Sequence, residues 1–580
     1  MNRLVIIFLF LCAAAAGTWF WYSSSRQAAK VEAANFAEYL PRDTLMVISF
    51  RDLNGFLQHA PKTAIGRAAS RIGDNGHGNS VGRAETPVKG SEEAGQGVPS
   101  GLANFWDLVN DPVFKVLAGD DFELAILNMD PDRVWEEPEK TVESSVLALA
   151  TLPSPNLLET FFSKFSGVKL EKITRDGIEL TKVILEDGTV LYLAYRGERV
   201  IIALDPDAIS RSLAVKGAAG QGLNTVVSFQ QAQKYWRSSG PQHLYVRTYI
   251  QVSQLQPLFN ALAQKDQAEL GEFFGEVAGL LQGIDYEAGI HGRDPGKWVV
   301  QGYAHYSYER LAPVMKEYVD SAKGKNLTYN LLAQDPVLYM WGIDFTKTAL
   351  TGELPPDQMQ ELNNLLQDYI GISLQEFADT FGPQWGVEVS RIVSAGLFPV
   401  PRMVMALQVR DRKRADGVFA RVRDLLAQSG TPLADKKISD NTIYFCPLTP
   451  GKDLQPAAVL GNKMFYISNN LSVAAEVVGQ EELSSLPGEM EQRLGADASA
   501  QLRNANGGVL LLWPNRLAEE LQPLLDWQMA KDLIDEDLLD GVMEMLRSTE
   551  VLLVTGRFDQ DHSSVRFIVR DNPTYGVAER

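Results

Sequence analysis

Hydrophobic residues along this chain occur in short runs that alternate with longer, periodic segments. The runs at 45–50, 146–151 and 403–408 are almost wholly apolar, which is typical of strands buried in a sheet. The segment 418–426 instead places apolar residues at the i, i+4, i+7 and i+8 spacing of an amphipathic helix. The pattern therefore predicts an α+β fold in which antiparallel sheets carry helices packed on one face.

The order of these runs recurs along the chain, which predicts an internal duplication. The first strand opener, Leu40-Pro41-Arg42-Asp43-Thr44, has a counterpart in Ala333-Gln334-Asp335-Pro336, and a Leu-Gln-Pro-Leu tetrapeptide occurs twice. The paired landmarks are 40–44 with 333–336, 146–151 with 403–408, 191–203 with 457–467, 255–258 with 521–524, and 292–293 with 556–557.

The repeat divides the chain into an N-terminal segment and four α+β units. Between the first two landmarks lies an insertion, 73–101, which holds eight glycines and no aromatic residue and has no match in the second copy. Such a composition predicts a flexible loop, because it offers too little apolar surface to offset the entropy of ordering. The predicted parts are 1–30 for the anchor and its exit, 37–225 with the insertion 73–101, 226–325, 329–480 and 495–572.

The N-terminal segment predicts a single transmembrane helix. Leu4 to Tyr22 contains no charge, and its 19 residues would form a helix of about 28 Å, close to the thickness of the hydrocarbon layer. An aromatic cluster ends the segment, as expected where a helix leaves the bilayer. The residues expected to anchor the chain are Leu4, Phe8, Leu11, Trp19, Trp21 and Tyr22.

Two alternatives for this segment stay open. Leu4 to Leu11 could form the apolar region of a signal peptide that is cleaved after Ala14-x-Ala16, or Cys12 could be lipidated, although Leu11 precedes it where a small residue is usual. In each case the body is exported. With the helix retained, we expect a single-pass inner-membrane protein with its body in the periplasm or extracytoplasmic space. Outside this segment the chain has one cysteine, Cys446, so the body can form no intrachain disulfide.

Charge argues against nucleic-acid binding. The 580 residues include 54 Lys and Arg against 73 Asp and Glu, which gives a net charge of −19. Phosphate backbones require net or clustered cations, so the expected partners are the membrane, through the N-terminal helix, and a protein or envelope polymer.

The sequence contains no recognisable catalytic motif. The six histidines lack metal-ligand spacing, although His291 and His305 could face each other across a hairpin. The glycine-rich segment 216–222 follows a helix-like stretch, which predicts a loop rather than a phosphate cradle, and the acidic runs 135–139 and 532–540 predict solvated faces. We therefore expect no catalytic residue, cofactor or metal ligand.

The anchor, the opener Leu40–Thr44 and the hairpin 191–203 together resemble an uncharacterised family of bacterial membrane-anchored extracytoplasmic proteins, known only as a domain of unknown function. The resemblance covers most of the chain after residue 36 and implies no catalytic residues. The second opener departs from it, with Gln334-Asp335-Pro336 in place of Pro-x-Asp-Thr.

Two functions remain possible. The first is a non-catalytic binding or scaffolding protein of the bacterial cell envelope, for which a duplicated body offers two related surfaces. The alternative is an envelope hydrolase whose carboxylates come from different strands and therefore leave no sequence motif. A cleft with two facing carboxylates of raised pKa would favour the hydrolase.

Overall fold

A computed structural model describes residues 36–51, 122–343 and 356–575, with short gaps at 153, 155, 163–166, 186–187, 217, 219, 266–268, 396–397, 429, 432, 439, 448–453 and 526–535. The predicted anchor 1–30 and the insertion 73–101 lie outside the described residues. Within the described ranges, no helix is both long and apolar enough to cross a membrane. The chain divides into two compact units, Met1–Ser307 and Tyr308–Arg580, and each is described by itself.

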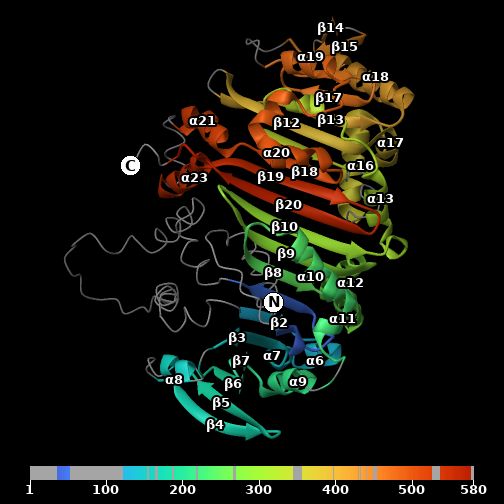
Figure 1. The fold of residues 1–580 in the computed structure, drawn as a ribbon. Coiled ribbons are helices and arrows are strands. Elements are labelled where there is room, and N and C mark those ends of the chain that lie inside the picture. Colours follow the sequence, from blue (N-terminus) through green and yellow to red (C-terminus); the bar gives the residue numbers. More distant parts are fainter. Residues whose placement is uncertain are drawn as a thin grey trace, which may run out of the picture. The chain divides into compact units, whose positions relative to one another are not determined.

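The first unit contains an antiparallel sheet with the order β4-β5-β6-β7-β3-β2-β1-β8-β9-β10 in the described part of the chain (Figure 1). Its strands are β1 (Met46–Phe50), β2 (Phe122–Ile126), β3 (Val146–Thr151), β4 (Lys169–Arg175), β5 (Ile178–Ile184), β6 (Val190–Arg196), β7 (Arg199–Ala203), β8 (His243–Ile250), β9 (Ile284–Asp294) and β10 (Lys297–Tyr306). Its helices are η1 (Phe36–Glu38), α6 (Pro131–Glu136), α7 (Pro138–Glu143), α8 (Asn156–Phe162), α9 (Pro206–Lys216), η3 (Leu223–Thr225), α10 (Val227–Ser239), α11 (Val252–Lys265) and α12 (Glu269–Leu280).

The second unit has the sheet order β14-β15-β16-β17-β13-β12-β11-β18-β19-β20, again antiparallel throughout the described residues. Its strands are β11 (Leu338–Gly342), β12 (Phe381–Ala395), β13 (Phe398–Val409), β14 (Ala434–Ile438), β15 (Asn441–Phe445), β16 (Ala457–Leu460), β17 (Met464–Ser468), β18 (Gly508–Leu512), β19 (Thr549–Phe558) and β20 (His562–Asp571). Its helices are η4 (Tyr308–Arg310), α13 (Pro313–Ser321), α14 (Tyr329–Leu332), α16 (Pro356–Ile370), α17 (Leu374–Thr380), α18 (Arg412–Gln428), α19 (Leu471–Gly479), α20 (Gly488–Asn504), α21 (Pro514–Leu525) and α23 (Glu536–Ser548).

The strand order of the first unit is thus the strand order of the second, with β1 to β10 replaced in sequence by β11 to β20. Corresponding strands also agree in register near the centre: Met46 lies opposite Ile250, and Leu338 lies opposite Leu512. The tetrapeptides do not occupy equivalent positions, because Leu255 is five residues beyond Ile250 whereas Leu521 is nine beyond Leu512. The identical tetrapeptides therefore lie in corresponding helices, α11 and α21. Their positions within these helices differ by one helical turn.

Helices cover both faces of the sheet in each unit, so the expectation of helices on one face is wrong. In β3, Leu149 belongs to a core with α9 and α10, whereas its neighbour Ala150 belongs to a separate core with α8. In the second unit, Ala406 packs in the core of α19 and α20, and Leu407 packs against the core of α17 and α18. Successive strand residues point to opposite faces, so helices on both faces account for apolar residues at consecutive strand positions, although Met405 of β13 is exposed.

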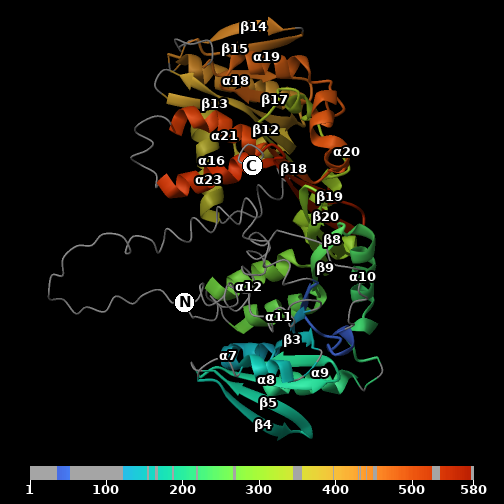
Figure 2. The same ribbon diagram turned by 60° about the vertical axis from the view of Figure 1, so that its left-hand side comes forward.

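Further along each sheet, a pair of helices packs beside the central strands. Figure 2 shows α11 and α12 lying together, and the rings of Phe259 and Phe274 stack between them with centroids 5.9 Å apart. In the second unit α21 and α23 form the corresponding pair around Ala518, Met543 and Leu546.

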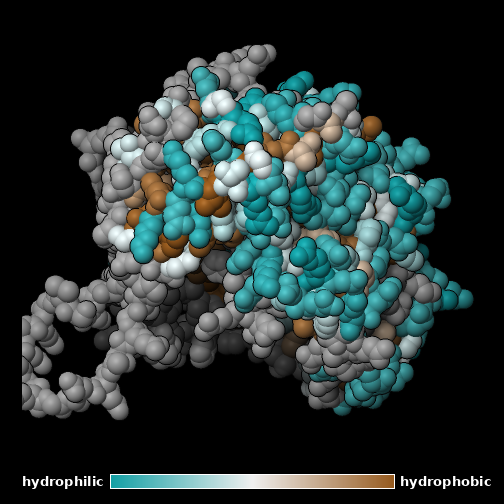
Figure 3. All heavy atoms as spheres, turned by 90° about the horizontal axis from the view of Figure 1, so that it is seen from below, coloured by the Kyte–Doolittle hydropathy of each residue, from teal (hydrophilic) through white to brown (hydrophobic). Residues whose placement is uncertain are grey.

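The outermost strand of each sheet exposes charged residues. Strand β4 is exposed along almost its whole length, as are Asp435, Lys436 and Lys437 of β14, and these two strands end the sheets of their units. On the face drawn in Figure 3, most coloured residues are hydrophilic and the hydrophobic ones gather in local patches.

Candidate functional site

A polar cavity in the first unit forms where the opener before β1 meets the start of α11. The antiparallel pairing of β1 with β8 creates this meeting, because the residues before Met46 must lie beside those after Ile250. The backbone N–H of Gln251 donates to the carbonyl oxygen of Leu45 at 2.8 Å. With its amide oriented to satisfy its surroundings, the side chain of Gln251 also donates to the carbonyl oxygens of Thr44 and Arg42, at 3.1 and 3.2 Å.

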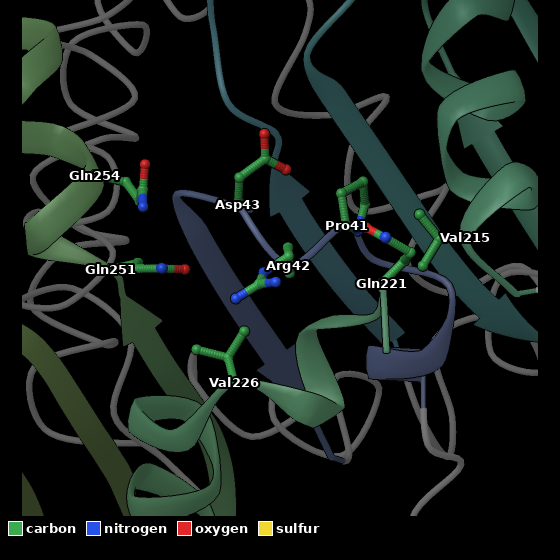
Figure 4. A pocket seen from close by; sticks show the side chains of 8 residues that line it. All are labelled: Pro41, Arg42, Asp43, Val215, Gln221, Val226, Gln251 and Gln254. Carbon is green, nitrogen blue, oxygen red and sulfur yellow. The ribbon is translucent and has the colours of Figure 1, made fainter. Parts of the chain in front are cut away.

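The cavity has a volume of about 400 Å³, which lies within the usual range of ligand pockets. In the described part of the chain, three glutamine amides, one guanidinium and one carboxylate supply its polar side chains (Figure 4), and Val215 of α9 and Gln254 of α11 also line it. Its lining residues are Pro41, Arg42, Asp43, Val215, Gln221, Val226, Gln251 and Gln254.

Asp43 is the carboxylate of this cavity, and it is only weakly engaged. Its Oδ2 accepts one hydrogen bond within the described residues, from Nδ2 of Asn128, at the long distance of 3.4 Å. Figure 4 shows the exposed Arg42 side chain pointing toward Gln251 and Val226, away from the Asp43 carboxylate. The anionic group is therefore half-buried and still able to accept a strong hydrogen-bond donor.

The equivalent position in the second unit is filled by the chain itself. Asp335 lies three residues before Leu338, as Asp43 lies three before Met46, and Arg516 lies four after Leu512, as Gln254 lies four after Ile250. Nη1 of Arg516 donates to Oδ1 of Asp335 at 2.8 Å, and Nη2 donates to Oδ2 at 3.0 Å. Such a two-pronged contact is the strongest geometry available to a guanidinium and a carboxylate.

A second cation completes this ion cluster. Nη1 of Arg493, from α20, donates to Oδ1 of Asp335 at 2.6 Å, and its guanidinium lies 3.7 Å from the ring centroid of Trp513. Burial and the nearby charge of Arg516 lower the pKa of Arg493 from its ordinary value. Trp513 follows Leu512 directly, so in the first unit its position belongs to Gln251. Arg516 and Trp513 of the second unit thus correspond to two glutamines that line the cavity of the first unit.

A buried carboxylate lies near this cluster in the core of the second unit. Glu388 of β12 is fully enclosed, and neither of its carboxylate oxygens has a hydrogen-bond partner among the described residues. Burial raises the pKa of Glu388 to about 8, although the guanidinium groups of Arg402 and Arg516 act in the opposite direction. Its position opposite Tyr339 and Val404 places it in the hydrophobic core, where it is closed to a substrate.

The residues expected to matter from the sequence have separate locations. The anchor residues Leu4, Phe8, Leu11, Trp19, Trp21 and Tyr22, together with Cys12, His59 and His77, lie outside the described residues. His291 and His305 do not face each other, because His291 lies opposite Val300 and His305 lies opposite Tyr286. His305 instead contacts Oδ2 of Asp285 through Nδ1 at 3.0 Å. Cys446 is half-buried with a free thiol.

No group of three or more possible metal-ligating side chains occurs in the part of the chain that the structure describes. The glycine-rich segment 216–222 does contribute to the cavity, through Gln221 and through a bridge between Gly222 and Pro41. Burial lowers the pKa of His291 to about 4, so this histidine is neutral near pH 7.

Sequence reasoning missed the cavity residues Gln251 and Gln254 and the buried Glu388. The available signal was the shared aspartate of the two openers, Asp43 and Asp335, which marks one position in both copies. Its partners could not be found because the glutamines stand some 200 residues further along the chain, and only strand pairing joins them to Asp43.

Comparison with known proteins returned few likenesses. No family model and no curated protein matches the chain. Two solved structures, titled "Structure of crystal form III of TP0453" and "Structure of crystal form I of TP0453", have TM-scores of 0.25 and 0.24 and are each 9% identical. The alignments cover 48% and 49% of this chain and 82% and 84% of those chains.

Proposed function

We propose that this chain is a non-catalytic, membrane-anchored binding or scaffolding protein of the bacterial cell envelope, with its body outside the cytoplasm. The observation that carries the proposal is the cavity of the first unit, which offers three amides, Arg42 and one carboxylate. Amide groups donate and accept hydrogen bonds without exchanging protons near pH 7, so they serve recognition rather than acid–base chemistry.

The geometry gives less support to an envelope hydrolase. A two-carboxylate mechanism needs both carboxyl groups to flank the substrate, with one of them protonated. Among the described residues, Asp43 is the single carboxylate that lines the cavity, and Glu388, whose pKa is raised, belongs to the other unit and is enclosed by its core.

Location is tested separately from binding. The full chain with a reporter that is active only in the periplasm, fused after Arg580, should give an active product in the membrane fraction. The matched control removes residues 1–30. Recovery of the full chain in the soluble cytosolic fraction would contradict the proposal.

Binding is tested by capture from envelope extracts. The full chain, purified in one mild detergent, should retain a specific protein or envelope polymer that a cavity variant, Gln251→Ala, retains less well. Glu179→Gln, an exposed change on β5 away from the cavity, is the control and should retain the partner as the parent does. Equal retention by Gln251→Ala and the parent would exclude the cavity as the binding site.

A further inference from the structure

We propose that the cavity of the first unit binds a guanidinium group through Asp43, as the second unit binds its own Arg516 through Asp335. This inference rests on the proposed binding function and names the chemistry of its ligand. Its basis is the comparison of two equivalent positions in one chain.

The carboxylates are equivalent because the sheet registers are equivalent. Each aspartate stands three residues before the first residue of a central strand, β1 or β11, and each strand pairs with the strand that leads into α11 or α21. In the second unit the first turn of α21 supplies Arg516, which also donates to the backbone carbonyl oxygens of Asp335 and Pro336 at 3.1 Å each. The corresponding turn of α11 supplies Gln254, which carries no charge.

The cavity supplies space where the second unit has side chains. Arg493, Trp513 and Arg516 form the cluster on Asp335. In the first unit Gln251 and Gln254 replace two of them, and Asp43 is among the residues that line a cavity of about 400 Å³. An arginine side chain entering this space would meet a half-buried carboxylate and the amide oxygen of Gln254, both of which accept hydrogen bonds from a guanidinium.

Guanidinium fits this site better than ammonium for a geometric reason. The planar fork of a guanidinium matches the two oxygens of a carboxylate, whereas an ammonium acts as a compact and strongly hydrated point charge. Asp335 shows that the same position in the fold accommodates the fork, with both of its oxygens engaged. The exposed cation Arg42 points away from the Asp43 carboxylate and so does not pair with it, and Oδ2 has only the long contact from Asn128.

The test titrates the full chain, in one mild detergent, with N-acetyl-arginine amide, N-acetyl-lysine amide and N-acetyl-citrulline amide, followed by saturation-transfer NMR. We expect saturable binding of the arginine compound, at least severalfold weaker binding of the lysine compound, and none of the uncharged citrulline compound. Equal binding of arginine and citrulline compounds would overturn the inference.

Two variants locate the binding. Asp43→Asn keeps the shape of the side chain and removes its charge, and it should weaken arginine binding by about tenfold or more, as expected for a charge-assisted pair. Gln254→Arg places a guanidinium from the chain itself beside Asp43 and should abolish binding. Glu179→Gln should bind like the parent. Unchanged binding in Asp43→Asn would show that the guanidinium does not use this carboxylate.

The source of the guanidinium is distinguished by a peptide, Gly-Gly-Arg-Gly-Gly amide, compared with free arginine. Binding of the peptide as tight as that of the amide assigns the site to an arginine of a partner protein, whereas binding of free arginine alone assigns it to a small molecule. Failure of the inference leaves the proposed function intact if Gln251→Ala still loses the captured partner. Failure of capture by the parent, with arginine still bound, removes the scaffolding role instead.

Discussion

Arg516 holds Asp335 with both of its terminal nitrogens, and no residue of the first unit performs this task for Asp43 among the described residues. The two copies therefore differ in the engagement of one carboxylate at an otherwise equivalent place. That difference separates a carboxylate paired with two guanidinium groups in one unit from a carboxylate beside a cavity in the other.

The paired aspartates should differ in their contribution to stability. Asp335→Asn removes the charge that Arg493 and Arg516 share, and should lower the free energy of unfolding by about 1 kcal/mol, a modest value because the carboxylate is two-thirds exposed. Asparagine also tolerates the left-handed backbone at this position, where φ is 53°. Urea unfolding of Asp335→Asn and Asp43→Asn measures the two contributions. An equal decrease in the free energy of unfolding would contradict the prediction that only Asp335 is held by an ion pair.

Glu388 should make the second unit less stable as the pH rises. Its pKa is about 8 in the folded chain and near 4.5 when unfolded, so between these values the folded state holds the proton more tightly. Stability should then decrease by about 1.4 kcal/mol per pH unit from about pH 4.5 to about pH 8, and level off above. Glu388→Gln should remove this slope and be more stable than the parent at pH 8. Urea unfolding from pH 5 to 9 measures both, and parallel pH curves would refute the prediction.

His291 should make the first unit less stable as the pH falls. Burial lowers its pKa to about 4 from an ordinary value of 6.5, so the unfolded chain binds the proton more readily. The contribution of the neutral imidazole to the free energy of unfolding is therefore fully present above about pH 6.5. It is lost as the pH falls toward 4. Hydrogen exchange of the β9 amides, measured in the parent and in His291→Gln as the pH is lowered, tests this prediction. We expect the loss of amide protection with falling pH to be smaller in the variant. His562→Gln, at a partly exposed site in the second unit, is the control.

Glu481 should be needed for the turn between β16 and β17. Its Oε2 accepts from the backbone N–H of Asn462 at 2.8 Å, and its Oε1 accepts from those of Lys463 and Met464 at 2.9 and 3.0 Å. Glu481→Gln replaces one accepting oxygen by an NH2 group, which cannot accept from these backbone N–H groups. The change should lower the free energy of unfolding by about 2 kcal/mol. Faster exchange of these three amides, with Glu482→Gln unchanged, is the expected result; protection equal to that of the parent would contradict it.

The sequence predicted the class of the fold because apolar runs and periodic segments report burial directly. It could not predict helices on both faces of the sheet. A run such as Val146–Thr151 has no alternation of polar and apolar residues, so it does not show which face of the strand is covered. Glu388 escaped notice because a charged residue in a strand usually faces water, and only its neighbours across β11 and β13 place it in the core. The cavity depends on strand pairing across long stretches of sequence, which local patterns do not contain.

The exposed, charged strands that end the two sheets limit how this protein can associate with others. Strand β4 presents Lys169, Glu171 and Lys172, and β14 presents Lys436 and Lys437, all of them exposed. Lysines on an outermost strand discourage the addition of a further strand, because a new backbone would have to desolvate their charges. Aggregation and amyloid-like growth are therefore opposed at these two strands, and a partner must be recognised there by its side chains rather than by its backbone.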